Sequence, residues 1–342
     1  MARPNSLSND FFVDTDIHAA ETLPPAAFTS PDFLNRELAT IFNHSWLPLP
    51  LRPSSVLRHD KRSFSELVSL RGSRMPTHLL ERPLFLQRDW EGVLRAFPNV
   101  CSHAWYPLVH GHERDKTIVC GQHGRKFDCQ GKVISQPGFS RKMKNFPRPC
   151  DHLATMPVEH FAKLSFTVFS VPNCDFEEKI RPIRESTALL PWNRLKRVAQ
   201  DDEQREVPGN WKQHVWNYMD HFHVGYIHRA PNGLADAIEM STYRTELHKR
   251  SALQWVYARN PNHGFEPHFL PERFIDKENP DKRVFALWFY LFPNLTLNFY
   301  PWGLSINIYE PSPSNPHKTL FQWYHFSWND ALYEKRDTLW HA

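Results

Sequence analysis

Two short segments of the chain carry a paired pattern of cysteine and histidine. The first is Cys101-Ser102-His103 and the second is Cys120-Gly121-Gln122-His123, with residues 104–119 between them. Each segment offers one thiolate and one imidazole, and both groups are common metal ligands. The four ligands suit either one tetrahedral zinc ion or a two-iron cluster, in which the thiolates hold one iron and the imidazoles hold the other. Both uses require the two segments to form neighbouring loops of one small domain.

The spacing within the pairs favours the cluster over zinc. Zinc sites usually place two or more residues between paired ligands, so Cys-x-His is tight for one ion. The second segment continues as His123-Gly124-Arg125-Lys126-Phe127-Asp128, with Gly131 after it, and resembles the second cluster-binding loop of Rieske proteins. The first loop fits at Pro107-Leu108 but has Ala104-Trp105 where an Arg-Gly pair is common. We therefore predict a Rieske [2Fe-2S] cluster bound by Cys101, His103, Cys120 and His123, with structural zinc as the alternative.

The composition is that of an ordinary globular protein and limits the possible partners. With 342 residues and 41% hydrophobic content, the chain is long enough for two domains. The formal charge of +4 comes without a basic run interleaved with aromatic residues, so we expect no nucleic acid partner. No apolar stretch approaches a membrane span, and the N-terminus is polar. Five cysteines do not make a disulfide framework in a chain of this size, so a cytoplasmic location is expected.

The distribution of apolar and turn-forming residues along the sequence predicts an α+β fold with two main domains. Residues 1–45 are expected to be a helical segment that packs on the catalytic domain, with a helix over residues 17–44. Short apolar runs between turn residues predict a small antiparallel β domain over 46–172, which contains both paired segments. Residues 173–342 are expected to form a helix-on-antiparallel-sheet domain, entered through a linker and a surface helix at residues 173–206.

A second candidate metal site lies in residues 210–228. Trp211, Val215, Met219 and Phe222 recur at helical spacing and predict a buried helix. Asp220 and His223 are three residues apart and share a face, but His223 and His228 would diverge by about 140° on an ideal helix. For the two histidines to bind one metal, the helix must break or bulge, and Gly225 lies where a break would help.

Taken alone, a histidine pair on a helix is more often structural than metal-binding. The interpretation changes because the same chain carries a one-electron carrier, which needs an acceptor. Two histidines and one carboxylate form the facial triad of non-haem Fe(II) oxygenases, which leaves coordination positions for O2 and substrate.

The two motifs together resemble those of the α subunit of Rieske non-haem iron oxygenases. This family includes aromatic-ring-hydroxylating dioxygenases and choline monooxygenase-like enzymes, and the resemblance lies in Asn-x-x-Asp-x-aromatic-His-x-x-x-x-His at residues 217–228. It implies an SRPBCC/START-like catalytic domain with a mononuclear Fe(II) held by His223 and His228. It also implies that Asp220 is an inter-subunit electron bridge to the Rieske histidine of a neighbouring chain. The expected assembly is a homotrimer that takes electrons from an NAD(P)H-dependent reductase or a ferredoxin.

The third iron ligand departs from the family pattern. The family places an aspartate in a C-terminal helix, some distance beyond the strand that ends here near Phe326, and Asp337 is early for that position. We expect the C-terminus to be truncated, with the carboxylate ligand beyond Ala342 and Asp337 as a weak candidate.

These residues predict an enzyme that hydroxylates a small organic substrate with O2. Aromatic pocket walls suit an aromatic ring by stacking and a quaternary ammonium or choline-like compound by cation–π contact equally well. The candidates for these walls, most of them expected in the core, are Trp255, Tyr257, Trp288, Tyr290, Phe299 and Trp302. The alternative function is a Rieske electron-transfer protein without oxygenase activity.

Overall fold

The described chain begins with short helices that lie against the largest sheet. The computed structural model describes residues 14, 16, 18–51, 69–139, 143–229 and 233–336. Helices α1 (Ala26–Thr29) and α2 (Pro31–Thr40) both contact strand β18, and η1 (Phe42–His44) follows. The Ser30 hydroxyl accepts the Phe33 N–H at 3.3 Å and so caps α2. The helix predicted over 17–44 therefore begins later, because residues 18–25 are not helical.

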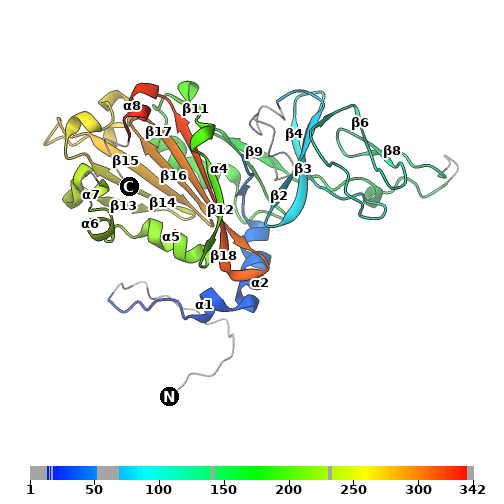
Figure 1. The fold of residues 1–342 in the computed structure, drawn as a ribbon, viewed down its shortest axis with the longest axis horizontal. Coiled ribbons are helices and arrows are strands. Elements are labelled where there is room, and N and C mark those ends of the chain that lie inside the picture. The colour runs from blue at the N-terminus through cyan, green and yellow to red at the C-terminus, as the bar shows by residue number, and fades with distance from the viewer. Residues whose placement is uncertain are drawn as a thin grey trace, which may run out of the picture.

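Three small antiparallel sheets follow and form the part of the molecule that holds the paired Cys and His segments (Figure 1). Their strand orders are β1-β10-β9, β4-β3-β2-β5 and β6-β7-β8. The bounds are β1 Leu47–Pro48, β2 Ser73–Leu79, β3 Arg82–Arg88, β4 Leu94–Pro98, β5 Glu113–Arg114, β6 Thr117–Val119, β7 Lys126–Asp128, β8 Val133–Ser135, η3 Pro149–Asp151, β9 Val158–Phe161 and β10 Leu164–Thr167.

An eight-stranded antiparallel sheet forms the second half of the molecule (Figure 1). Its order is β11-β18-β17-β16-β15-β14-β13, and β12 also pairs with β18. The strands are β11 Lys196–Arg197, β12 Glu203–Pro208, β13 Arg244–Leu247, β14 Ser251–Tyr257, β15 Val284–Leu291, β16 Leu295–Tyr300, β17 Gly303–Ser312 and β18 Asn315–Ser327. The helices are α4 Phe176–Ser186, η4 Trp192–Arg194, η5 Ala199–Asp201, α5 Trp211–Met219, α6 Val224–Ile227, α7 Leu234–Ala237, η6 Met240–Thr242, η7 Pro261–His263, η8 Pro267–Phe269, η9 Glu272–Phe274 and α8 Asp330–Glu334. The α+β fold predicted from the sequence is confirmed, whereas the domain boundaries stay a prediction.

The two faces of the large sheet differ in chemistry. Because successive side chains of a strand point to opposite faces, each cross-strand row belongs to one face. The row that contains Leu253, Phe289 and Leu297 belongs to a large apolar core, together with Ile180 and Ile183 of α4. Both isoleucines are fully buried, whereas Glu177, Arg184 and Glu185 on the other side of α4 are exposed, so α4 packs one face on this core and is the surface helix predicted for this region.

The opposite face carries a row of polar residues across five strands. The register pairs Gln254 with Trp288, Trp288 with Asn298, Asn298 with Ser305, and Ser305 with His325. All five side chains are buried. Buried polar groups on a sheet face are costly unless they are hydrogen-bonded, so this face is expected to serve a function.

A buried carboxyl joins the small sheets to the large one. The two-residue turn between β2 and β3, Leu80-Glu81, has positive φ at both positions, 54° and 58°. The Leu80 N–H donates to Glu310 Oε1 of β17 at 2.6 Å. Glu310 therefore fixes a strained turn of one half of the molecule to a central strand of the other.

None of the helices in the described part of the chain is long and apolar enough to cross a membrane.

Candidate redox and metal centres

The two paired segments form loops with the same backbone pattern. In the first loop the Cys101 N–H donates to Tyr106 O at 2.8 Å, and the Trp105 N–H donates to Cys101 O at 2.9 Å. In the second loop the Cys120 N–H donates to Arg125 O and the Gly124 N–H donates to Cys120 O, both at 2.9 Å. The equivalent residues Trp105 and Gly124 both have left-handed φ, 55° and 68°. Glycine adopts this conformation without strain, and tryptophan does not.

The loops bring the four candidate ligands together in two pairs, one of thiols and one of imidazoles. The Cys101 and Cys120 side chains are buried and interact with each other, and burial raises the pKa of the Cys101 thiol. The His103 and His123 rings are exposed, with their centroids 4.8 Å apart. In the described residues, no group of three or more His, Cys, Asp and Glu side chains gathers where one metal ion would be held. A pair of thiols and a pair of imidazoles are the ligand set that a Rieske cluster uses.

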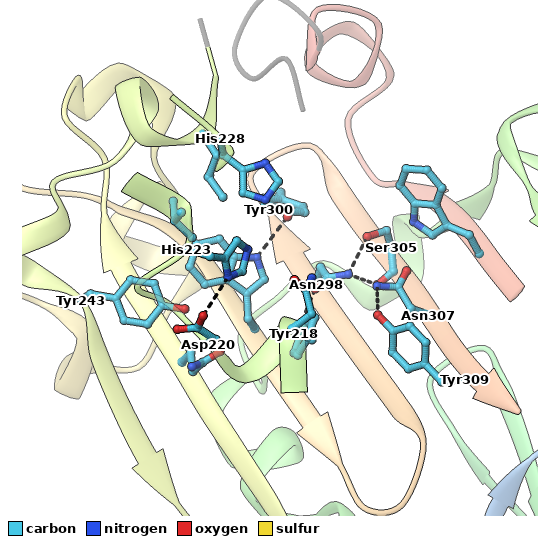
Figure 2. A pocket seen from close by; sticks show the side chains of 16 residues that line it. Tyr218, Asp220, His223, His228, Tyr243, Asn298, Tyr300, Ser305, Asn307 and Tyr309 are labelled. Carbon is cyan, nitrogen blue, oxygen red and sulfur yellow. Dashed lines mark hydrogen bonds and ion pairs between the residues drawn. The ribbon is translucent and has the colours of Figure 1, made fainter. Parts of the chain in front are cut away.

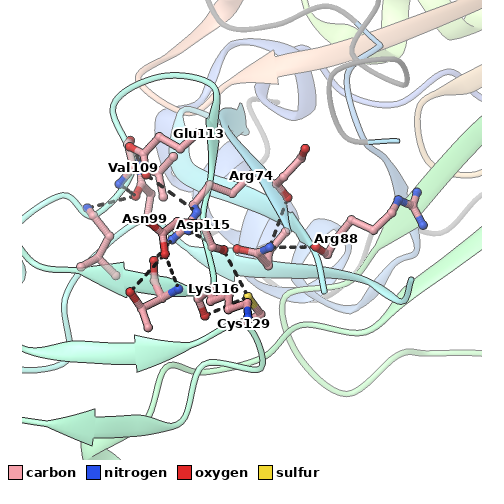
Figure 3. Close-up of polar contacts among 12 residues, drawn as sticks. Arg74, Arg88, Asn99, Val109, Glu113, Asp115, Lys116 and Cys129 are labelled. Atoms are coloured by element: carbon pink, nitrogen blue, oxygen red, sulfur yellow. Dashed lines mark hydrogen bonds and ion pairs between the residues drawn. The ribbon is translucent and has the colours of Figure 1, made fainter. Parts of the chain in front are cut away.

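Buried polar side chains hold these loops in place. The Asn99 side chain accepts the N–H groups of Leu108 and Val109 at 3.1 and 2.9 Å and donates to Val109 O at 2.8 Å, which fixes the end of the first loop. A second buried side chain, Arg74, donates from its guanidinium to Thr117 O at 2.7 Å and Asp115 O at 3.0 Å (Figure 3). Arg74 thus supports the strand that leads to Cys120.

Arg125 connects the two loops directly. It is 2% exposed, and its Nη1 donates to the Ser102 hydroxyl of the first loop at 3.0 Å. Its Nε donates to Gln136 Oε1 at 2.6 Å, and Nη1 also lies 3.4 Å from Asp151 Oδ1. Because the charged guanidinium is paired and hydrogen-bonded, it can be buried without a large penalty.

The second candidate site is formed where helix α5 ends. Asp220 is the C-terminal cap of α5 and has extended backbone angles, and its Oδ1 accepts the Phe222 N–H at 2.8 Å. This local hydrogen bond competes with helix continuation. His223 and His228 then flank the one-turn helix α6 at its two ends. The break that the sequence requires is thus present, but it lies at residues 220–222, and Gly225 is an ordinary residue inside α6.

The three candidate side chains converge at this break (Figure 2). His223 Nδ1 lies 3.6 Å from Asp220 Oδ2, and the ring centroids of His223 and His228 are 5.2 Å apart. His223 Nδ1 is buried and has no hydrogen-bond partner. Burial and the neighbouring His223 charge both lower the pKa of His228, so this imidazole is neutral at neutral pH and available to a metal.

Two further predictions about this segment have different outcomes. Phe222, expected on the buried stripe with Trp211 and Val215, is 73% exposed because the helix ends before it. Within the described ranges, no carboxylate joins His223 and His228 to complete a set of three metal ligands. Asp337, the weak candidate for this role, lies outside the described residues.

A cavity of about 230 Å³ opens beside the two histidines, over the polar face of the large sheet. Asp220, His223 and His228 line it together with aromatic and uncharged polar residues (Figure 2). Those other lining residues are Asn217, Tyr218, Val224, Leu234, Tyr243, Gln254, Trp288, Asn298, Tyr300, Ser305, Asn307, Tyr309 and Trp323. Burial raises the pKa values of Tyr218, Tyr243 and Tyr300, so these phenols stay neutral.

Sequence reasoning missed most of this cavity. Of the aromatic residues considered as pocket walls, only Trp288 lines it. Tyr257 and Phe299 belong to the core on the other face of the sheet. The missed signal was the regular alternation of polar and apolar residues in Leu295-Thr296-Leu297-Asn298 and Leu304-Ser305-Ile306-Asn307, which places polar side chains on one face of two strands.

Two family models match the two halves of the chain. Residues 63–157 match the Rieske [2Fe-2S] domain, and residues 192–338 match the ring hydroxylating alpha subunit (catalytic domain). In the described residues, the paired loops lie in the first match and the histidine pair and cavity in the second.

Curated relatives and solved structures agree with these matches. The chain is 24% identical to the carnitine monooxygenase oxygenase subunit of Acinetobacter baumannii, over 99% of this chain and 84% of that protein. It is 22% identical to the chloroplastic choline monooxygenase of Arabidopsis thaliana, over 94% of this chain and 71% of that protein.

Among solved structures, the quaternary ammonium Rieske monooxygenase CntA superposes with a TM-score of 0.69 at 20% identity, covering 94% of this chain and 79% of that one. Naphthalene 1,2-dioxygenase from Rhodococcus sp. superposes with a TM-score of 0.67 at 18% identity, covering 89% of this chain and 73% of that one. The expected cofactors, a Rieske cluster and a mononuclear iron, are those of the two matched domains. The chain belongs to the α subunits of the Rieske non-haem iron oxygenases, enzymes that accept electrons from a reductase or ferredoxin and bind O2 and a substrate.

Proposed function

We propose that the cavity beside Asp220, His223 and His228 is where this oxygenase hydroxylates a small organic substrate. The observation that carries the proposal is the convergence of two histidines and a carboxylate at the rim of a cavity large enough for a small molecule. When bound, the cluster supplies single electrons and the mononuclear iron supplies O2 activation.

The chain's own residues have distinct roles in this proposal. Cys101, His103, Cys120 and His123 hold the cluster, and His223 and His228 hold the iron. Asp220 faces Nδ1 of His223 at 3.6 Å, which leaves Nε2 of that ring for the metal. A carboxylate on the outer nitrogen of a ligating histidine fixes its tautomer and orientation. Asp220 is therefore a positioning residue for the iron site as well as the proposed electron bridge.

The substrate is proposed to be an aromatic ring or a quaternary ammonium compound. The named relatives act on carnitine and choline, and a structural neighbour is a naphthalene dioxygenase. In the cavity, the rings of Tyr243 and Trp288 are nearly parallel, with their centroids 5.7 Å apart. The ring of Tyr300 packs edge-to-face against Trp288. Such aromatic faces bind either class by stacking or by cation–π contact.

The path of the electron favours an assembly of several chains. The cluster loops flank β6, whereas the histidine pair flanks α6, and Figure 1 draws these elements at opposite ends of the molecule. Exposed apolar side chains surround both centres: Trp105 and Tyr106 beside the cluster, and Phe222, Tyr226 and Ile227 beside Asp220. Exposed apolar patches of this kind often mark protein interfaces. We propose a ring-shaped homotrimer in which the two patches meet, so that an electron passes from His123 of one chain through Asp220 of its neighbour.

The electron donor is proposed to be an NAD(P)H-dependent reductase, acting directly or through a ferredoxin. A cytoplasmic location is also proposed. All five cysteines lie within the described residues and none forms a disulfide, which is the usual state of thiols in that compartment.

Two measurements test this function. Purified protein should contain two cluster irons and one further iron per chain, whereas an electron-transfer protein would hold only the two. Mixing Cys101→Ser chains with His223→Ala chains should restore product formation, because each mixed interface can pair an intact cluster with an intact iron site. Absence of the further iron would remove the oxygenase proposal, and absence of complementation would favour electron transfer within one chain.

A further inference from the structure

We propose that a row of tyrosine and tryptophan rings carries unused oxidising equivalents from the iron site to the protein surface. This inference rests on the proposed function, since an iron held by His223 and His228 is the source of these equivalents. The rings of the row all belong to one hydrophobic cluster. They are Tyr243, Trp288, Tyr300, Trp302 and Tyr333.

The row begins in the wall of the cavity. Tyr243, Trp288 and Tyr300 line the cavity together with the two histidines (Figure 2). The Tyr243 ring also stacks on the ring of His221, the neighbour of Asp220, with centroids 4.7 Å apart and an interplanar angle of 17°. The first rings of the row therefore lie beside the candidate iron site.

The next rings follow in direct contact. The ring centroids of Tyr243 and Trp288 are 5.7 Å apart, and Trp288 Nε1 donates to the Tyr300 hydroxyl at 3.0 Å. Tyr300 and Trp302 then stack with centroids 4.7 Å apart and an interplanar angle of 5°. Because each separation is short, a single electron can pass from ring to ring in steps.

The two faces of strands β15 and β16 differ in how easily their rings are oxidised. The face in the apolar core carries Phe289 and Phe299, whose benzene rings are hard to oxidise. The cavity face carries Trp288 and Tyr300, whose indole and phenol rings lose an electron much more readily. Trp302 is absent from the cavity lining and yet continues the same type of ring, so the polarity of the cavity does not explain the series.

The row ends at a tyrosine that can release its proton. Tyr333 of α8 belongs to the same buried cluster as Trp302, and its hydroxyl donates to Asp201 Oδ2 at 2.7 Å. A phenol that loses an electron becomes strongly acidic, so a carboxylate in hydrogen-bond contact can accept the proton as the electron leaves. The Asp201 side chain is 27% exposed, and Arg336 pairs with it at 2.9 Å. The last ring is therefore coupled to solvent through Asp201.

The path moves electrons and one proton and breaks no bond between heavy atoms. When an oxidising equivalent remains at the iron site with no substrate to hydroxylate, one electron enters the site from Tyr243 or Trp288. Each ring is then reduced by the next one, and Tyr333 finally loses an electron to the row and its hydroxyl proton to Asp201. A one-electron reductant in solution, such as ascorbate, returns an electron to Tyr333, and Asp201 or water returns the proton. The row thus protects the histidine ligands from oxidation.

Hydrogen peroxide tests this path without product formation. It supplies oxidising equivalents at the iron of substrate-free protein, and a nitroso spin trap followed by peptide mass spectrometry locates the protein radical. In iron-loaded wild-type protein the trap should label Tyr333. Trp302→Phe should lose this label and show more oxidation of His223 and His228, because the row is interrupted. Tyr333→Phe, remote from the cavity, should raise the oxidation of the same two histidines.

Controls separate the path from direct attack by peroxide. Trp255→Phe and Tyr257→Phe make the same exchanges in β14, where both side chains pack on the apolar core, and should keep the label on Tyr333. The iron content of every sample is measured first. Iron-loaded wild-type protein without the label overturns the proposal, as does an unchanged label in Trp302→Phe or in His223→Ala protein, whose mononuclear site is empty. Wild-type protein that binds no iron beyond the cluster would instead remove the proposed function, and with it the source of the oxidising equivalents.

Discussion

Replacing Glu310 with glutamine should stabilise the protein at alkaline pH and weaken it slightly at acid pH. Glu310 is buried, and it accepts hydrogen bonds from the Leu80 N–H at 2.6 Å and from Gln322 Nε2 at 3.3 Å. Burial is the main cause that raises the pKa of this carboxyl from 4.5 to about 7, with the nearby Glu81 charge adding to it. The folded protein therefore holds a proton here more tightly than the unfolded chain does.

The size of the effect follows from this pKa. A rise from 4.5 to about 7 corresponds to about 3 kcal/mol, at about 1.4 kcal/mol per pH unit. Because the folded pKa is the higher one, the stabilisation by the proton is fully present below pH 4.5 and is lost as the pH rises to about 7. Glutamine keeps an oxygen for the Leu80 N–H but presents an amide to Gln322 Nε2, which costs about 1 kcal/mol at every pH. Glu310→Gln should thus be about 2 kcal/mol more stable than wild type at pH 8 and about 1 kcal/mol less stable at pH 4.5.

Urea denaturation at the two pH values measures this difference through the midpoint of the transition. Glu266→Gln is the control, because Glu266 is exposed and is not among the groups that act on the Glu310 carboxyl, so its effect should stay within about 0.5 kcal/mol. If Glu310→Gln were destabilised equally at pH 8 and pH 4.5, the carboxyl would be ionised in the folded protein at both values. The assignment of Glu310 as a protonated link between the two halves would then be wrong.

Three further predictions concern the redox path. Cys120→Ser should remove the visible absorption of the cluster while circular dichroism keeps the β-sheet signal, and a colourless wild-type protein with one zinc per chain would contradict the cluster. Asp220→Asn should keep all three irons by metal analysis but lower product formation about tenfold or more, because an amide neither orients His223 as well nor carries the bridge; activity near wild type would exclude this role. Trp105→Gly should raise the stability of the single chain by about 1 kcal/mol, since glycine relieves the left-handed φ of 55°, yet weaken self-association in sedimentation, whereas Leu247→Ala, at a remote exposed position, should change neither.

The bounds of two central strands of the large sheet can be predicted from the sequence because their signals are local. The apolar runs at Val284–Leu291 and Leu295–Tyr300 end at the same residues in the structure, since Pro293, Asn294 and the turn after Tyr300 interrupt them. The cluster loops could be recognised for the same reason, because each is one continuous segment. The end of helix α5 was not predicted, since apolar spacing continues to Phe222. There the side chain of Asp220, bonded to the Phe222 N–H, decides the backbone.

The cavity required information that no single segment holds. Gln254, Trp288, Asn298 and Ser305 come from four strands and meet only because the register pairs them. In each strand, one polar residue between apolar neighbours does not indicate a cavity by itself, since a strand with one solvent-exposed face shows the same alternation. Burial distinguishes the two cases, because a buried acceptor without a hydrogen bond, such as Gln254 Oε1, lowers the stability of the fold. The register therefore has to be known before the row can be recognised as the lining of a cavity beside His223 and His228, because only the pairing of the strands brings these side chains to one face.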